Sequence, residues 1–137
     1  MKIVHAALVC CVLLSSGRVD AEEHPTTFRL LACKVRAEYV SLVFKDEAGH
    51  GRHIAFMDGY KEMLLESPST KGLLKWGNTV AIHITPSTSG DDHRLMAIEY
   101  RNDGDSSVHM FEAGLIDNSC SANLRARYGS SLRFVDR

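Results

Sequence analysis

The stretch RLMAIEYRNDGDSSVHMFEAG, residues 94–114, decides the fold because it predicts a β-hairpin. We interpret residues 94–101 and 107–114 as two strands, and the segment NDGDS between them supplies the Asn, Asp and Gly residues that adopt positive φ angles in hairpin loops. Strands joined by such a short loop lie antiparallel. The hairpin therefore predicts an antiparallel sheet, to which segments nearer the N-terminus can add.

Three of those earlier segments predict further strands. Residues 79–85, TVAIHIT, place Val and Ile at every second position, which is the pattern of a strand with one buried face. Residues 37–45 are rich in β-branched and aromatic residues and lead into a turn with two glycines, after which residues 53–57, HIAFM, form a hairpin partner. The preceding stretch FRLLACK is ambiguous, because its apolar residues also match a helical stripe.

Residues 58–76 predict one or two short helices. Asp58 can accept backbone N–H bonds at a helix start, the residues KEMLLES are strong helix formers, and Pro68 ends the segment. A second helix through LLKW would end at Gly77. We therefore expect an α+β fold, with a mostly antiparallel sheet of about five strands and one or two helices packed on one face. A further helical turn or two is expected within residues 122–128.

The N-terminal segment, residues 1–21, has the pattern of a secretory signal peptide. Lys2 precedes an apolar run from Ile3 to Leu14, and a V-x-A sequence ends at Ala21. The run is shorter than the roughly 20 apolar residues that cross a bilayer, so we expect cleavage and export rather than membrane anchoring. Residues 22–137 are then expected to form a single small secreted domain.

The expected cleavage changes the cysteine content. Cys10 and Cys11 leave with the signal peptide, so Cys33 and Cys120 remain near the two ends of the domain. In an oxidising compartment such a pair is expected to form one disulfide, which would close a long loop. Two free thiols are the alternative, since the chain has no C-x-x-C motif or Cys/His cluster.

Charge, histidine spacing and motifs argue against several kinds of partner. Without residues 1–21 the chain has 14 basic and 16 acidic side chains, and it has no polybasic field to attract nucleic acid or a membrane surface. His50 and His53 could share a metal with His83, His93 or the acidic pair at 91–92, but their spacing is unlike that of known zinc sites. We expect a monomer with no metal, cofactor, nucleic-acid or membrane partner.

One set of residues has the composition of a catalytic site. Glu99 and Arg101 share a face of the predicted strand, and His109 on the partner strand could lie opposite them. A carboxylate base, a histidine acid and a cation would suffice for a small ribonuclease-like hydrolase. The chain has no G-x-S-x-G, H-E-x-x-H or glycine-rich phosphate loop, so catalysis by these three residues is an alternative rather than the main expectation.

The order of these features resembles that of the small secreted effectors of biotrophic plant-pathogenic fungi. A signal peptide precedes a chain of about 116 residues, with an early cysteine in FRLLACK, a late one in DNSCS, and a hairpin just before the late cysteine. The resemblance implies a protein that binds a host protein and suppresses host defence without catalysis, either outside host cells or after translocation into them. A ribonuclease-like hydrolase and a carbohydrate- or lipid-binding domain are the alternatives.

Overall fold

The computed structural model describes residues 26–86 and 93–137. Over these residues the chain forms a nine-stranded mixed sheet and a single α-helix, in the strand order β5-β4-β3-β2-β1-β8-β7-β6-β9. The signal peptide expected at residues 1–21 lies outside the described residues. The strands are β1 (Arg29–Val35), β2 (Tyr39–Lys45), β3 (Gly51–Met57), β4 (Glu62–Glu66), β5 (Lys71–Lys75), β6 (Thr79–Pro86), β7 (His93–Tyr100), β8 (His109–Asp117) and β9 (Phe134–Asp136), and the helices are the 3-10 turn η1 (Trp76–Asn78) and α2 (Asn118–Tyr128).

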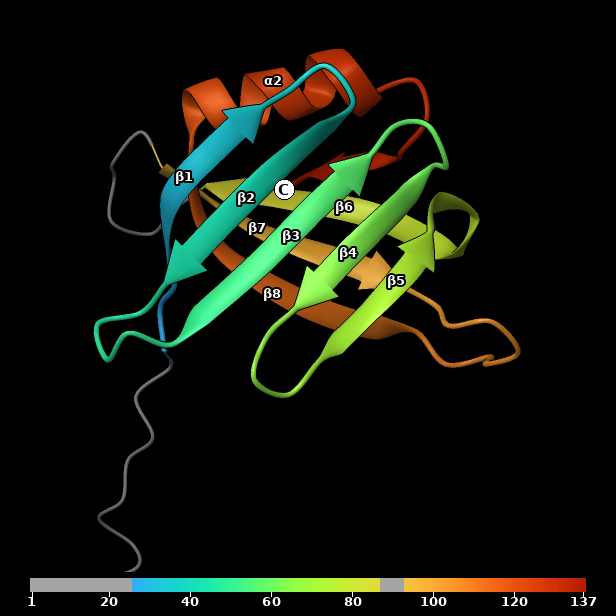
Figure 1. The fold of residues 1–137 in the computed structure, drawn as a ribbon, viewed down its shortest axis with the longest axis horizontal. Helices are drawn as coiled ribbons and strands as arrows, with labels where there is room; N and C mark the ends of the chain where they lie inside the picture. Colours follow the sequence, from blue (N-terminus) through green and yellow to red (C-terminus); the bar gives the residue numbers. More distant parts are fainter. Residues whose placement is uncertain (1–25, 87–92) are drawn as a thin grey trace, which may run out of the picture.

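The sheet bends over on itself into two layers. Strands β1 to β5 form one layer, and β8, β7 and β6 pass behind it, with α2 lying across one end (Figure 1). The layers are continuous only at β1 and β8, which run parallel and share the single register pair Arg29 and Leu115. The N–H of Leu115 donates to the carbonyl of Phe28 across this seam, at 2.8 Å. β6 and β9 are also parallel, and the other neighbours are antiparallel.

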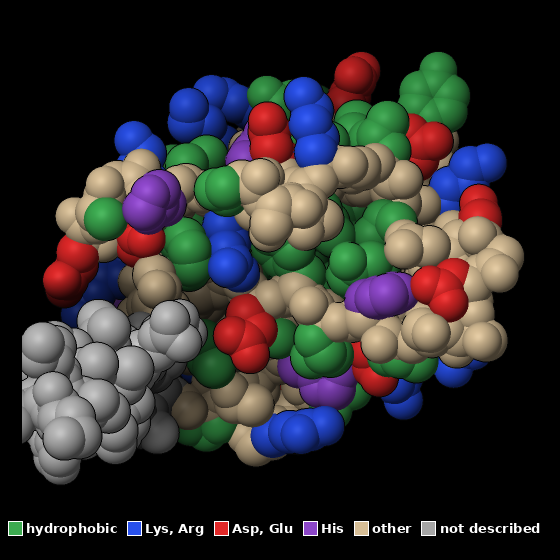
Figure 2. Space-filling model, turned by 90° about the horizontal axis from the view of Figure 1, so that it is seen from below, with side chains coloured by type: hydrophobic (Ala, Val, Ile, Leu, Met, Phe, Trp, Pro, Cys, Tyr) green, Lys and Arg blue, Asp and Glu red, His purple; other side chains and the backbone are tan. Residues whose placement is uncertain are grey.

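The core fills the space between the two layers. Strand side chains alternate between faces, and the largest fully buried side chains recur at every second position of their strands. Seen from below, hydrophobic side chains are visible in a hollow at the centre of this end of the molecule, with charged residues around it (Figure 2). The side chains at most 1% exposed include Val40, Leu42, Phe44, Ile54, Phe56, Met63 and Leu65 in one layer, and Ile82, Ile84, Met96, Ile98 and Ile116 in the other.

Helix α2 covers one end of this core. The carboxylate of Asp117 accepts from the N–H of Cys120 at 2.7 Å, which satisfies a backbone donor of the first turn. Cys120, Leu124 and Tyr128 recur every fourth residue and are each 1% exposed, so one face of the helix is buried. The Tyr128 hydroxyl donates to the carbonyl of Phe56 at 2.9 Å. The helix thereby closes the core and also binds the backbone of β3.

Two arginines join elements that are not neighbours in the sheet. Arg127 of α2 donates to Asp58 at 2.7 Å and to the carbonyl of Ala37 at 2.6 Å, which ties the helix to two turns of the first layer. The hydrogen bond to Asp58 raises the pKa of Arg127. Arg52 of β3 reaches across to the second layer, where its guanidinium lies 5.2 Å from the ring centroid of Phe111 on β8. Arg52 also donates to the carbonyl of Glu112.

The disulfide between Cys33 and Cys120 is present. It joins β1 to the first turn of α2, across a sequence separation of 87 residues. Both sulfurs belong to the core, since Cys120 is buried and Cys33 packs against the buried cluster. The bond therefore fastens the helix to the strand that lies at the seam between the two layers.

The expectation of a five-stranded, mostly antiparallel sheet with helices over residues 58–76 is wrong. That region forms β4 and β5, followed only by the turn η1. Met63 and Leu65 are buried while the alternate residues of β4 are half-exposed, so the pattern has period two and pairing with β3 overrides local helix propensity. Pro68 lies at the second position of a turn in which Ser67 and Thr70 bond reciprocally, where its fixed φ angle suits the turn.

Other elements were predicted with mixed success. The hairpin of β7 and β8, the hairpin of β2 and β3, and strand β6 are confirmed. The helix expected within residues 122–128 is present but begins earlier, at Asn118. The ambiguous stretch from Phe28 is resolved as β1, and the C-terminal segment contains the short strand β9. No helix of the described chain is long and apolar enough to span a bilayer.

Replacing both disulfide cysteines, Cys33→Ser with Cys120→Ser, is expected to lower the free energy of unfolding by about 4–5 kcal/mol, because the unfolded chain regains the entropy of a long open loop. Urea unfolding of the variant and of the oxidised wild type, followed by circular dichroism, measures the difference. Equal transition midpoints would contradict a stabilising disulfide.

Stability is expected to fall as the pH rises above about 10, the ordinary pKa of a tyrosine hydroxyl. Burial, aided by the negative charge of Asp58, raises the pKa of Tyr128, so the folded protein keeps this hydroxyl neutral while the unfolded chain ionises it. Unfolding free energies at pH 7 and at pH 10–11 measure the decline. Tyr128→Phe is the control: it should lose about 1 kcal/mol at pH 7 with the hydrogen bond, and show a shallower alkaline decline. An unchanged decline would rule out Tyr128 as its source.

Candidate functional site

Glu99, the expected general base, lies on the outer face of β7 and contacts a different histidine. Its Oε2 is 3.1 Å from Nε2 of His83 on β6 and 3.6 Å from Nη2 of Arg133. His83 is 9% exposed, so this contact satisfies a largely buried imidazole. The carboxylate is thus held between two cationic or potentially cationic groups of β6 and the C-terminal segment.

His109, the expected general acid, lies on the opposite face of the sheet from Glu99. It is directly across from Tyr100, with their ring centroids 5.4 Å apart and stacked. Since Glu99 and Tyr100 are consecutive in a strand, their side chains point to opposite faces. His109 instead bonds Asp105 at 2.9 Å, and this bond, with the N–H of Ser107, lowers the pKa of Asp105.

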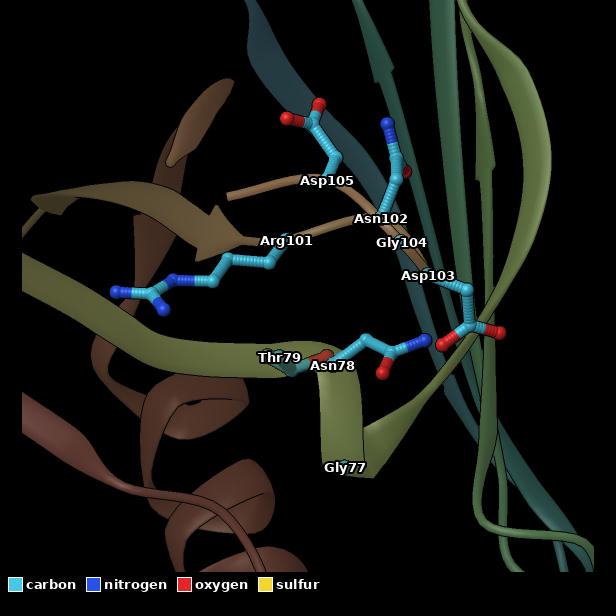
Figure 3. Close-up of a pocket in the computed structure, with 8 residues that line it drawn as sticks. All are labelled: Gly77, Asn78, Thr79, Arg101, Asn102, Asp103, Gly104 and Asp105. Carbon is cyan, nitrogen blue, oxygen red and sulfur yellow. The ribbon is translucent and has the colours of Figure 1, made fainter. Parts of the chain in front are cut away.

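Arg101, the third residue of that set, follows β7 and borders a polar hollow of about 370 Å³ between two loops. Its N–H donates to the carbonyl of Asn78 at 2.7 Å, which joins the loops. The side chains of Arg101 and Asp103 point in opposite directions, and that of Asp105 points away from both (Figure 3). Because Glu99 and His109 lie on opposite faces of the sheet, the three residues do not form one site. The residues around the hollow are Gly77, Asn78, Thr79, Arg101, Asn102, Asp103, Gly104 and Asp105.

The histidines considered as metal ligands have separate partners. His50 bonds Asp46 at 3.1 Å in the turn after β2, and His53 bonds Ser41 at 2.9 Å. Within residues 26–86 and 93–137, no three His, Cys, Asp or Glu side chains gather as a metal site. The acidic pair at 91–92 lies outside the described residues.

The contact of His53 belongs to a three-residue cluster that sequence reasoning missed. Nε2 of His53 is 2.9 Å from Oγ of Ser41, and Nδ1 is 3.7 Å from Oε2 of Glu66. Ser41 lies on β2, His53 on β3 and Glu66 on β4. Val43, which shares a face of β2 with Ser41, pairs with His53, and His53 pairs with Glu66, so the three side chains lie on one face of the sheet. Only the strand register, which the sequence did not reveal, could have brought them together.

The order serine, histidine and carboxylate in this cluster matches the relay of a serine hydrolase. The cluster lacks two requirements of such an enzyme, an accessible serine hydroxyl and free N–H groups that could bind an oxyanion. Ser41 is only 8% exposed and is not among the residues around the adjacent 360 Å³ hollow, which His53 and Glu66 border. It also lies within a strand paired on both sides, with β1 and β3, so neighbouring N–H groups are engaged in ladders rather than free to bind an oxyanion. We interpret the cluster as a polar network on the sheet face.

The edge strand β5 has backbone N–H and C=O groups that form no hydrogen bond with any described residue. Hydrogen-bonded pairs alternate along an antiparallel ladder. On the β4–β5 hairpin they include Ser67 with Thr70 at 2.6 Å, and Trp76 with Lys61 at 2.8 Å, so Gly72 and Leu74 are the bonded residues of β5. The N–H and C=O groups at 71, 73 and 75 therefore point away from β4, toward an edge that no other strand of the described chain covers.

The outer face next to this edge is partly apolar. Ala55, Leu64 and Leu73 lie side by side across β3, β4 and β5, and we call this row the apolar strip. Leu73 is 59% exposed, at the very edge of the sheet. Lys71 and Lys75 flank it, both exposed and both on the same face. Together the strip and the free edge form the candidate functional site.

Comparison with protein-family models, curated proteins and solved structures found no match for this chain.

Wild-type protein is expected to remain unlabelled at Ser41 by a fluorophosphonate probe, because the hydroxyl is buried and has no oxyanion site beside it. Peptide mass spectrometry after incubation at pH 7.5 measures the adduct, with a known serine hydrolase as positive control. An adduct at Ser41 that disappears in His53→Ala would contradict our interpretation and establish a working relay.

Proposed function

We propose that this protein is a secreted, effector-like interaction protein that binds a host protein and thereby suppresses host defence, without catalysis. The observation that carries the binding role is the free edge of β5 beside the apolar strip. An exposed strand edge offers a row of main-chain donors and acceptors to a second chain, and adjacent apolar side chains add contact area. The placement of Leu73, 59% exposed between Lys71 and Lys75, supports this role.

The secreted and host-directed parts of the proposal have other grounds. The segment MKIVHAALVCCVLL has the composition of an export signal, and the disulfide between Cys33 and Cys120 suits a chain that folds in an oxidising compartment. The resemblance to fungal effectors provides the host context. The ribonuclease-like alternative receives no such support, since Glu99 and His109 lie on opposite faces of the sheet.

A binding experiment with matched variants tests the proposal. The oxidised protein is immobilised and exposed to host extracellular fluid and to host cytosol in separate arms, and each retained protein is identified, purified and titrated against the wild type. Leu73→Glu places a charge on the strip and is expected to weaken binding at least tenfold. Leu95→Glu is the matched control, because Leu95 is 40% exposed on β7 in the other layer, and it should bind as the wild type does.

The role in defence is measured separately, by the host oxidative burst during infection with strains that carry the intact gene, the deleted gene or the Leu73→Glu gene. The intact gene should lower the burst, and the other two should not. Failure to retain any host protein in either arm, or equal binding by the two glutamate variants, would overturn the proposal.

A further inference from the structure

We infer that the occupant of the β5 edge is an extended segment of the partner that carries acidic, apolar and acidic side chains at alternate positions and adds to the sheet as a further strand. This inference rests on the proposed function, whose partner it specifies by chemistry.

The edge itself defines the spacing of such a segment. The backbone groups at Lys71, Leu73 and Lys75 point away from β4, so they can form hydrogen-bonded pairs with three alternate residues of an incoming strand. The side chains of those same three residues project from the outer face. Any strand that pairs here therefore meets a lysine, a leucine and a lysine on one face of the sheet.

The strand already present on the other side of β5 shows which side chains fit this pattern. β4 has the sequence EMLLE, and its outward residues Glu62, Leu64 and Glu66 lie directly opposite Lys75, Leu73 and Lys71. Opposite charges and apolar pairs at directly opposed positions stabilise strand pairing. A second strand with the same alternation would repeat this arrangement on the free edge, so the fold contains its own example of the expected partner sequence.

The same lysines disfavour a second copy of this chain as the occupant. In an antiparallel pair of β5 strands centred on Leu73, Lys71 of one copy would lie opposite Lys75 of the other, and the reverse. Like charges directly opposite each other destabilise a ladder, and lysines at an edge are a common means of preventing self-association. The charges at the edge thus favour pairing with an acidic strand and disfavour pairing with β5 of a second copy.

Hydrogen exchange measured by NMR tests this inference on the oxidised protein. The probe is the end-blocked peptide Thr-Glu-Thr-Leu-Thr-Glu-Thr, and its counterpart with lysine in place of both glutamates is the charge control. In the free protein the amides of Lys71, Leu73 and Lys75 should exchange quickly and those of Gly72 and Leu74 slowly. The glutamate peptide should slow exchange of the first three at least tenfold, and the lysine peptide should bind at least tenfold more weakly.

Two variants separate charge recognition from strand addition. Lys71→Gln with Lys75→Gln should abolish the preference between the peptides, because both charges are gone. Leu73→Pro removes one outward N–H without touching a bond to β4, and it should prevent protection of the edge by either peptide. The glutamine variant changes only exposed side chains, so it remains informative if the proline variant does not fold.

The results also distinguish this inference from the proposed function. Equal affinity for the two peptides, protection of amides outside β5, or association of the protein with itself upon concentration would each overturn the inference. If a host protein is bound through Leu73 but no edge amide is protected in that complex, the proposed function stands and strand addition fails. If the peptides behave as expected but no host protein is retained, the edge chemistry is supported and the proposed function fails.

Discussion

The fold depends on a narrow seam between two layers of one sheet. β1 and β8 share the single pair Arg29 and Leu115, so the ladder alone gives the layers little connection. Gly114 makes the close approach possible, since its φ is +138° and an added Cβ would lie 2.4 Å from the carbonyl oxygen of Phe28. The remaining connection comes from the shared core, the disulfide, and arginines that reach between elements. Packing and crosslinks thus add to the narrow seam in keeping the layers together.

The parts of the fold predicted correctly are those in which a local pattern and tertiary pairing agree. In TVAIHIT the alternation of apolar residues predicts a strand, and β6 is that strand, although Ala81 and His83 on its other face are buried as well. Residues 58–76 fail because Glu, Met, Leu and Lys favour helices locally, whereas Met63 and Leu65 bury at period two once β3 and β5 lie beside them. β9 has only three residues and pairs in parallel with β6, so it is too short for an alternating hydrophobic pattern to predict it.

The candidate site was the least predictable feature, because it depends on the position of a strand within the sheet. The local sequence predicts a helix that includes Lys71, Leu73 and Lys75. Only the strand order shows that these residues lie at an edge of the sheet. Glu99 and His109, two residues of the alternative catalytic set, are separated for a related reason. A shift of one residue in register moves a side chain to the other face of the sheet. His109 pairs with Tyr100 rather than with Glu99, so it lies on the face opposite Glu99. Residue types suggest chemistry, but register decides which of them meet.

The crosslink between Cys33 and Cys120 makes the lifetime of the fold depend on the redox poise of its surroundings. Thiol-rich cytosol reduces disulfides, whereas extracellular fluid preserves them; because Cys120 is buried, reduction of this bond requires the fold to open locally. Where the bond stays oxidised, the fold keeps the stability that the closed loop contributes. Inside a reducing compartment, the same chain opens more often, because the loop of 87 residues is no longer closed in the unfolded state. The same sequence thus has two stabilities, one with the Cys33–Cys120 bond closed and a lower one with it reduced.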